Sequence, residues 1–171
     1  MTIQIKLDAN TRYAGFWRRA AASLIDTLLL MPLLAIILYL LYGPAYFEWY
    51  ATPHAPFESY GSGAVLVNQL LPIALIVFFW VKFLGTPGKL LLDCYVVHAQ
   101  TGKPLGAGRA LLRYLGYYVS ALPLMLGFLW VAWDKRKQGF HDKIANSVVV
   151  IRDESGKTLE ELREEYGEDF R

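Results

Sequence analysis

The sequence predicts an all-α integral membrane protein with a small two-stranded β element on the cytoplasmic side. Its 171 residues are 55% apolar and only 19% charged, whereas about a quarter of the residues are charged in typical soluble domains. The apolar residues also lie in runs close to the roughly 20 residues that cross a bilayer as a helix. These runs predict two full transmembrane helices, followed by a third helical region that proline and glycine interrupt.

The first predicted span runs from about Phe16 to Tyr42 and contains one carboxylate, Asp26. A charged side chain inside a membrane helix costs about 2.5–3.5 kcal/mol on insertion scales, so it needs a partner or a purpose. Positions i, i+3, i+4 and i+7 form one helix face, and here they hold Arg19, Ala22, Ser23 and Asp26. We expect another helix or a wet cavity beside this small and polar face.

The segment between the first two spans, residues 43–62, is predicted to be a loop on the outer side. It contains Glu48 and Glu58 but no lysine or arginine, whereas Arg12, Arg18 and Arg19 lie before or at the start of the first span. The positive-inside rule therefore places the N-terminus in the cytoplasm. The protein is expected to be a multi-pass protein of the cytoplasmic (inner) membrane.

The second predicted span runs from about Gly63 to Leu84 and carries Asn68 and Gln69 near its outer end. These two polar side chains either hydrogen-bond to the first helix or line a polar path. A β-prone stretch, residues 90–98, follows this span.

The third apolar region, Leu105–Trp133, contains Pro123 and Gly127, and two arrangements of it stay open. It either crosses once as a third span or returns as a re-entrant hairpin. A return satisfies the positive-inside rule and lets residues 146–151, a second predicted strand, pair with the strand before the region. Against a return, each arm has only about half of the roughly 20 residues that a span needs.

Residues 1–151 therefore form the predicted membrane domain, and residues 152–171 form a charged soluble tail. Within the membrane domain, Arg109 and Arg113 lie at i and i+4 on one face of the third region. Such spacing suits a helix at the membrane surface or one that enters from the cytoplasm.

Three stretches of this chain together resemble the RDD family, small membrane proteins named for one arginine and two aspartates. They are Arg-Arg-Ala-Ala-Ala-Ser-Leu-Ile-Asp at 18–26, Gly-Thr-Pro-Gly-Lys at 85–89 and Phe-His-Asp-Lys-Ile-Ala-Asn-Ser-Val-Val-Val at 140–150. The resemblance implies that Arg19, with Arg18 as the neighbouring alternative, is the family's arginine and that Asp26 and Asp142 are its aspartates. It implies a fold more firmly than an activity, although some members have been linked to cation/proton exchange or solute transport.

A buried ion pair is the main expectation for Asp26. Arg19 lies seven residues earlier, roughly 10 Å along a helix, so Arg109 or Arg113 is an alternative partner. A protonatable carboxylate on a cation or proton path is the functional interpretation. Asp142 is expected either to cap the turn at residues 143–145 or to pair with an arginine.

Enzymatic chemistry is disfavoured. The chain has no nucleophile motif and no zinc-protease helix, and Cys94, His98 and His141 lack the spacing of a standard metal site. We therefore expect no catalytic residues, no cofactor, no metal and no nucleic-acid partner.

The lipid bilayer is the expected environment of the protein. Two classes of function remain. The first is transport of a cation, a proton or a small solute along Asp26, Asn68, Gln69 and the basic residues. Because two or three helices cannot enclose an aqueous path, transport implies a homo-oligomer. The alternative is an accessory or assembly subunit that docks onto another membrane protein through the polar face of the first helix.

Overall fold

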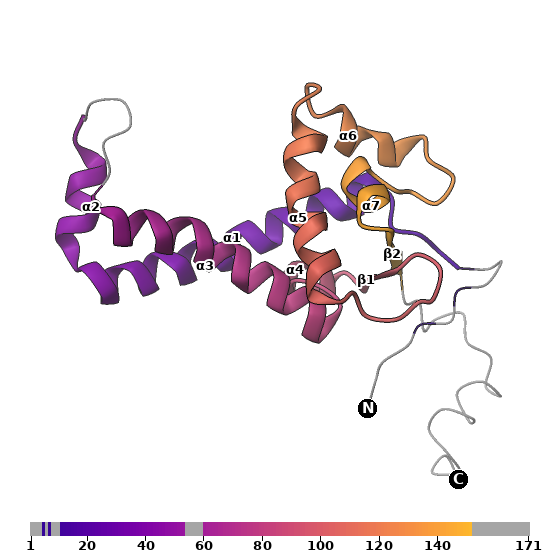
Figure 1. Cartoon of the computed structure of the whole chain (residues 1–171), viewed down its shortest axis with the longest axis horizontal. Helices are drawn as coiled ribbons and strands as arrows, with labels where there is room; N and C mark the ends of the chain where they lie inside the picture. The colour runs from indigo at the N-terminus through magenta and orange to yellow at the C-terminus, as the bar shows by residue number, and fades with distance from the viewer. Residues whose placement is uncertain (1–4, 6, 8–10, 54–59, 152–171) are drawn as a thin grey trace, which may run out of the picture.

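The computed structural model describes Ile5, Leu7, residues 11–53 and residues 60–151. In this part of the chain a helical arm projects from a compact end (Figure 1). The arm consists of α1 (Phe16–Tyr42), α2 (Pro44–Ala51) and α3 (Ser62–Phe83). The compact end contains α4 (Pro87–Leu91), β1 (Cys94–His98), α5 (Ala107–Ala121), α6 (Leu126–Leu129), the 3-10 turn η1 (Trp130–Ala132), α7 (Phe140–Ile144) and β2 (Ser147–Ile151). The predicted soluble tail and Glu58 lie outside the described residues.

The arm supplies the two membrane spans that the apolar runs predict. Among the described residues, Phe16–Tyr42 and Gly63–Leu91 are the two stretches long and apolar enough to cross a membrane as helices. The bounds of α1 coincide with the predicted first span, and α3 begins and ends within one residue of the predicted second span. Leu28, Met31 and Leu40 on α1 are exposed, as expected for side chains that contact lipid.

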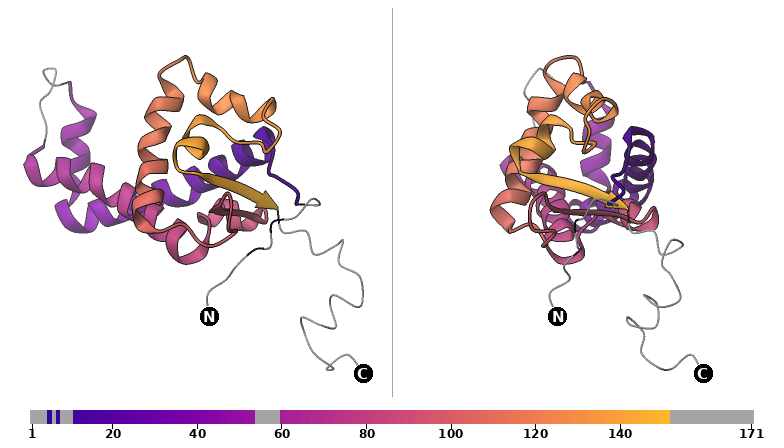
Figure 2. Two further views of the ribbon diagram at one scale, coloured as in Figure 1. Left: turned by 45° about the vertical axis from the view of Figure 1, so that its right-hand side comes forward. Right: turned by 90° about the vertical axis from the view of Figure 1, so that its right-hand side faces the viewer.

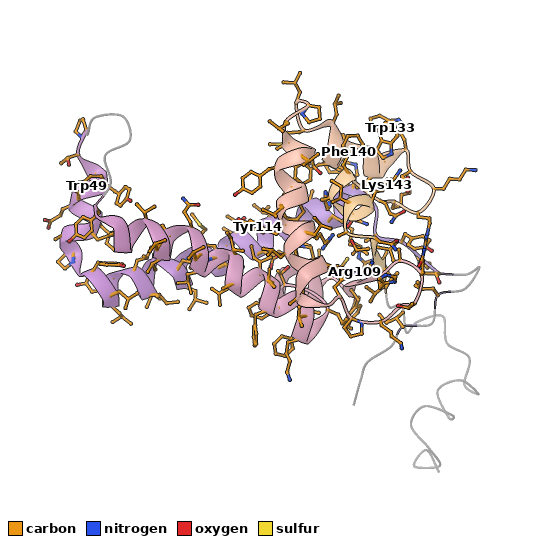
Figure 3. The ribbon with its side chains drawn as sticks, in the orientation of Figure 1. Trp49, Arg109, Tyr114, Trp133, Phe140 and Lys143 are labelled. Atoms are coloured by element: carbon orange, nitrogen blue, oxygen red, sulfur yellow. The ribbon has the colours of Figure 1, made fainter. Side chains whose placement is uncertain are left out.

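The predicted outer loop contains a helix, α2, at the far end of the arm, where Figure 3 labels Trp49. Pro44 occupies the first turn of α2, where its missing N–H leaves no hydrogen bond unmade. The ring centroid of Tyr46 lies 5.6 Å from that of Tyr42 and 4.8 Å from that of Tyr50. Aromatic packing against the end of α1 therefore stabilises a helix where proline and glycine predicted an irregular loop.

The third apolar region is bent, and it returns to the sheet from which it started. The chain turns by 113° between α5 and the α6–η1 segment. The strand before α5 pairs antiparallel with the strand after α7, from Cys94 opposite Ile151 to His98 opposite Ser147. Because both ends of the region lie at one sheet, the structure favours a return over a single crossing.

The orientation of α5 differs from that of a hairpin inserted parallel to the spans. Figure 1 and both views of Figure 2 show α5 running across the end of the α1–α3 arm. The apolar side chains Leu111, Leu115, Tyr118 and Leu122 are exposed on it at helical spacing. This arrangement resembles a helix that lies along the membrane surface with its apolar face toward the lipid.

The two strands form the core of the compact end. Val96 and Val149 pack in one buried cluster with Trp80 of α3, whereas Val97 and Val148 pack in another on the opposite face of the sheet. Both faces of the sheet are therefore covered, and the end of α3 is fixed against it.

Candidate functional site

Asp142 is fully buried and is the centre of a charge cluster. The Nε and Nη2 atoms of Arg113 donate hydrogen bonds to its Oδ1 atom at 3.0 and 2.6 Å, and Nη1 of Arg19 donates to Oδ2 at 2.5 Å. The backbone N–H of Gly139, just before α7, also donates to Oδ2, at 3.1 Å. The arginine partner expected for Asp142 is present. The expected cap of the turn at residues 143–145 is not what the structure shows, because Asp142 lies inside α7 and its carboxylate binds the N–H of the residue before that helix.

Electrostatics keeps Asp142 ionised. Burial raises the pKa of this carboxyl, but the charges of Arg19 and Arg113 outweigh burial and hold the pKa well below its usual range. Such paired and hydrogen-bonded charges chiefly fix how elements dock. Here they join the first turn of α1, the middle of α5 and the start of α7.

The arginine of this cluster is Arg19 and not its neighbour. Nε and Nη2 of Arg19 donate to the backbone carbonyls of Ala14 and Lys137, at 2.8 and 2.6 Å, in addition to the bond with Asp142. Arg18 instead donates to the carbonyl of Leu92 at 2.9 Å, outside the cluster. Of the two adjacent arginines, the structure thus places Arg19 in the buried cluster.

Small residues allow α5 to pack directly on α7. Ala110, Gly116 and Ser120 are buried on the same face of α5 as Arg113. A Cβ on Gly116 would lie 2.8 Å from the Cα of His141, so the approach of the two helices depends on a residue without a side chain.

His141 is a neutral neighbour of the charge cluster. Burial lowers its pKa to about 3, Asp142 raises it, and Arg113 and Arg19 lower it further. Its Nδ1 atom lies 3.1 Å from the Ser120 hydroxyl, and its ring packs 4.7 Å from that of Tyr117. The surroundings of His141 therefore favour its neutral form at physiological pH.

Asp26 belongs to a second polar group, separate from the arginines. The Thr86 hydroxyl donates to its Oδ2 atom at 2.5 Å, and the backbone N–H of Gly88 donates to Oδ1 at 2.7 Å. The ammonium of Lys89 lies 3.5 Å from Oδ2. Asp26 and Lys89 are 8% and 7% exposed, so this is a buried ion pair whose members also have hydrogen-bond partners.

The predicted arginine partners of Asp26 are wrong. Arg19 and Arg113 bind Asp142, and Arg109 is exposed near the beginning of α5 (Figure 3). The actual partners come from the short helix α4 and the residue before it, within the stretch 85–89 that contributes to the family resemblance. The expected shielding of this face of α1 holds for Ala22 and Asp26, because α4 packs on them, whereas Ser23 on the same face is exposed.

The predicted roles of the polar residues in the second span are also corrected. Asn68 accepts a hydrogen bond from the Tyr46 hydroxyl at 2.8 Å and donates to that of Tyr50 at 3.3 Å. It therefore ties α3 to α2 and not to the first helix. Gln69 is exposed, and neither residue is among the described residues that line the cavity described next.

A cavity of about 650 Å³ lies between α1, α3 and the compact end. Its polar lining includes Arg19, Ser23 and Asp26 from α1, with Thr86, Lys89, Arg113 and His141 from the compact end. The remainder is mostly apolar and extends along α1 to Leu34 and along α3 to Pro72. The two polar groups thus meet at one end of an apolar cavity.

Comparison with known proteins agrees with these features. Residues 13–146 match the profile of the RDD family. The chain belongs to the RDD family. This RDD protein is 30% identical over 149 residues to the "Uncharacterized protein YxaI" of Bacillus subtilis (strain 168), which covers 81% of the chain and 97% of the relative.

A shorter similarity joins this RDD protein to mycobacterial antigens. It is 38% identical over 63 residues to the "Proline-rich antigen homolog" of Mycobacterium tuberculosis (strain ATCC 25618 / H37Rv) and 36% identical over 63 residues to the "Proline-rich antigen" of Mycobacterium leprae (strain TN). These matches cover 37% of the chain and only 26% and 25% of the relatives. No solved structure matches the chain.

Proposed function

We propose that this membrane protein takes part in transport of a cation, a proton or another small solute, and that it is not an enzyme. One observation carries the proposal: the carboxylate of Asp26 lines a cavity in the membrane arm and is paired with a lysine. Ionisable residues inside membrane helices are costly, and they commonly mark ion or proton paths.

The Asp26 group has the chemistry that cation exchange requires. Carboxylate and hydroxyl oxygens are the ligands that hard cations prefer, and Asp26 and Thr86 present both kinds side by side. The ammonium of Lys89 already occupies the position of a counter-charge. A cation that reaches Asp26 would compete with Lys89 for the carboxylate, and a proton would release Lys89 by neutralising Asp26.

We infer that the transporting unit is a homo-oligomer. The described residues contain two spanning helices, and the cavity wall that they form is mostly apolar. A water-filled path must be separated from the lipid by protein on all sides, because polar groups at membrane depth must face protein or water. Further copies of the chain would supply the missing walls.

An accessory subunit that docks through the polar face of α1 is the weaker candidate. Ala22 and Asp26 on this face are buried beneath α4, and Arg19 is bound to Asp142. Little of the face is left for another membrane protein.

The charge distribution supports a cytoplasmic N-terminus in the cytoplasmic membrane. Lysines and arginines are frequent in the described residues of the compact end, whereas α2 at the other end of the arm contains Glu48 and no basic residue. The positive-inside rule then places the compact end and the start of α1 in the cytoplasm.

Flux measurements on reconstituted protein test the proposal. Proteoliposomes with an imposed pH gradient are given sodium, potassium or lithium, and the gradient is followed with a pH-sensitive dye. We expect Asp26→Asn to abolish the cation-dependent signal, whereas the control Asp134→Asn, at a carboxylate outside the cavity lining, keeps it. Both variants should accumulate and elute at the same oligomeric size as the wild type.

Two results would contradict transport. One is a wild-type signal no larger than that of protein-free liposomes for every cation, and the other is an unchanged signal in Asp26→Asn. A foreign membrane protein that co-purifies with the wild type but not with this variant would favour the accessory role instead.

A further inference from the structure

Two buried hydrogen-bond donors lack an acceptor in the described part of the chain. They are Nη1 of Arg113 and Nε1 of Trp80. Each side chain is 1% exposed, and both belong to the wall of the cavity. The guanidinium carbon of Arg113 lies 4.7 Å from the centroid of the Trp80 ring, so the two donors share one location. Buried donors are nearly always satisfied in folded proteins. We therefore expect an acceptor from a bound ligand at this location.

The charge of the surrounding groups indicates the sign of that acceptor. Arg19, Lys89 and Arg113 contribute three positive charges, and Asp26 and Asp142 contribute two negative charges, which leaves a net charge of +1. His141 adds nothing, because burial lowers its pKa to about 3. The polar end of the cavity therefore favours an anionic group.

The rest of the cavity has the length and the apolar lining that a hydrocarbon chain requires. Its lining extends along α1 from Arg19 to Leu34, a distance of roughly 22 Å at 1.5 Å per residue. The facing wall on α3 includes Pro72, Leu75 and Ile76. Its volume of about 650 Å³ lies within the roughly 300–1,000 Å³ of typical ligand cavities.

The cavity also opens toward the position of the bilayer. Met31 lines it and is 62% exposed, and Ser23 and Thr27 line it and are exposed as well. These exposed lining residues place the opening of the cavity along α1, one of the two spanning helices. A lipid chain can enter there from the side of the spanning helix.

We propose that the cavity binds an anionic membrane lipid, with an acyl chain between α1 and α3 and its acidic headgroup beside Arg113 and Trp80. Basic pockets between membrane helices near the cytoplasmic surface are known to hold acidic headgroups. Free phosphate has the same headgroup chemistry, but it would leave the apolar part of the cavity unfilled. This inference goes beyond the transport proposal and does not depend on it.

Spin-labelled lipids provide the test. The full-length protein is reconstituted in phosphatidylcholine vesicles, and electron paramagnetic resonance compares the protein-bound fractions of labelled phosphatidylglycerol and labelled phosphatidylcholine. Trp80→Phe removes one donor and keeps an aromatic ring and the net charge. Leu75→Trp fills the cavity. Trp130→Phe is the matched control, because Trp130 is not among the described lining residues.

The wild type and Trp130→Phe should prefer phosphatidylglycerol, and Trp80→Phe should lower that preference about fivefold, the equivalent of one hydrogen bond. Leu75→Trp should abolish it. The same preference in all four proteins would overturn the proposal, since it would come from surface charge. Displacement of the labelled lipid by inorganic phosphate alone would overturn it in favour of a free-anion site.

If Trp80→Phe fails to fold, as judged by circular dichroism, Leu75→Trp decides alone. These outcomes are separable from those of the flux experiment. A loss of flux in Asp26→Asn does not require lipid selectivity, and lipid selectivity does not require any flux.

Discussion

The backbone N–H of Gly88 donates a 2.7 Å hydrogen bond to the carboxylate of Asp26, 62 residues earlier in the chain. The bond exists because α4 approaches α1 without an intervening side chain. A Cβ at position 88 would clash with the carbonyl oxygen of Ala22 and would lie 2.8 Å from the backbone nitrogen of Asp26. The shielding of Asp26 from lipid therefore depends on a glycine.

Gly88→Ala should destabilise the protein. Overpacking a tight contact typically costs about 1–3 kcal/mol, and separation of α4 from α1 would also weaken the hydrogen bond to Asp26. Gly108→Ala is the matched control, because Gly108 lies in α5 with nothing within 4 Å of the added Cβ, and alanine favours a helix by up to about 1 kcal/mol. Thermal unfolding in detergent should give a lower midpoint for Gly88→Ala only. Equal midpoints would show that the contact is not tight.

The elements that were predicted correctly are those that local sequence determines. An apolar run of sufficient length must form a helix in a membrane, because every backbone polar group needs a partner within the segment, and so the bounds of α1 followed from the sequence. The two β-prone segments favoured a return of the third region, since strands pair only when they lie on the same side, but the length of the region left a single crossing open.

The partners of Asp26 were not predicted, because they depend on how distant segments approach each other. Residues 85–89 have the local features of a turn, and their contact with α1 appears only in the tertiary structure. A signal was nevertheless present. Lys89 is a lysine among apolar residues in a stretch that resembles the family, and it was the obvious counter-charge for a carboxylate.

Helix periodicity alone also could not show which of Arg109 and Arg113 is buried. Arg109 and Arg113 are one turn apart, yet only Arg113 is buried. The small residues Ala110, Gly116 and Ser120 share the buried face with Arg113. Their spacing could have indicated the packed face of this helix and hence the buried arginine.

Arg19→Lys should be much more harmful than Arg18→Lys. The guanidinium of Arg19 reaches Asp142 and the carbonyls of Ala14 and Lys137 with three different nitrogens, and an ammonium does not reproduce this fixed geometry. Arg18 has one carbonyl partner and a long, exposed contact with Asp93. We expect a loss of about 2–5 kcal/mol for Arg19→Lys, in the range for a damaged buried pair, and under about 1 kcal/mol for Arg18→Lys.

Chemical denaturation in detergent, followed by tryptophan fluorescence, measures the free energy of unfolding of both variants. The comparison is direct because both substitutions keep the positive charge. If the two variants lose the same stability, the assignment of Arg19 to the buried cluster is wrong.

His141 should make the protein less stable in mild acid. Burial lowers its pKa to about 3, compared with 6.5 for an unhindered histidine. Below pH 6.5 the unfolded chain therefore binds a proton that the folded chain does not, and stability falls as the pH decreases toward about 3. The slope approaches about 1.4 kcal/mol per pH unit for one group.

His141→Asn should flatten this dependence, because asparagine keeps a polar atom near Ser120 but does not titrate. Denaturation midpoints at several pH values between about 6.5 and 4 supply the measurement. His98→Asn serves as the comparison. Burial also lowers the pKa of His98, but this side chain is only half-buried and should contribute less. An unchanged slope in His141→Asn would mean that other groups cause the acid sensitivity.

The antiparallel pair of strands predicts the membrane topology of the whole chain. Because β1 and β2 pair in full register, the loops near Lys103 and Lys135 must lie on one side of the membrane, and α2 must lie on the other. Single cysteines at Lys103, Lys135 and Ala51, in a Cys94→Ser background, can be labelled with a membrane-impermeant maleimide in intact cells. Only the cysteine at position 51 should react before lysis, and all three should react afterwards. Reaction of position 135 together with position 51 in intact cells would mean that the third region crosses the membrane, which the strand pairing does not permit.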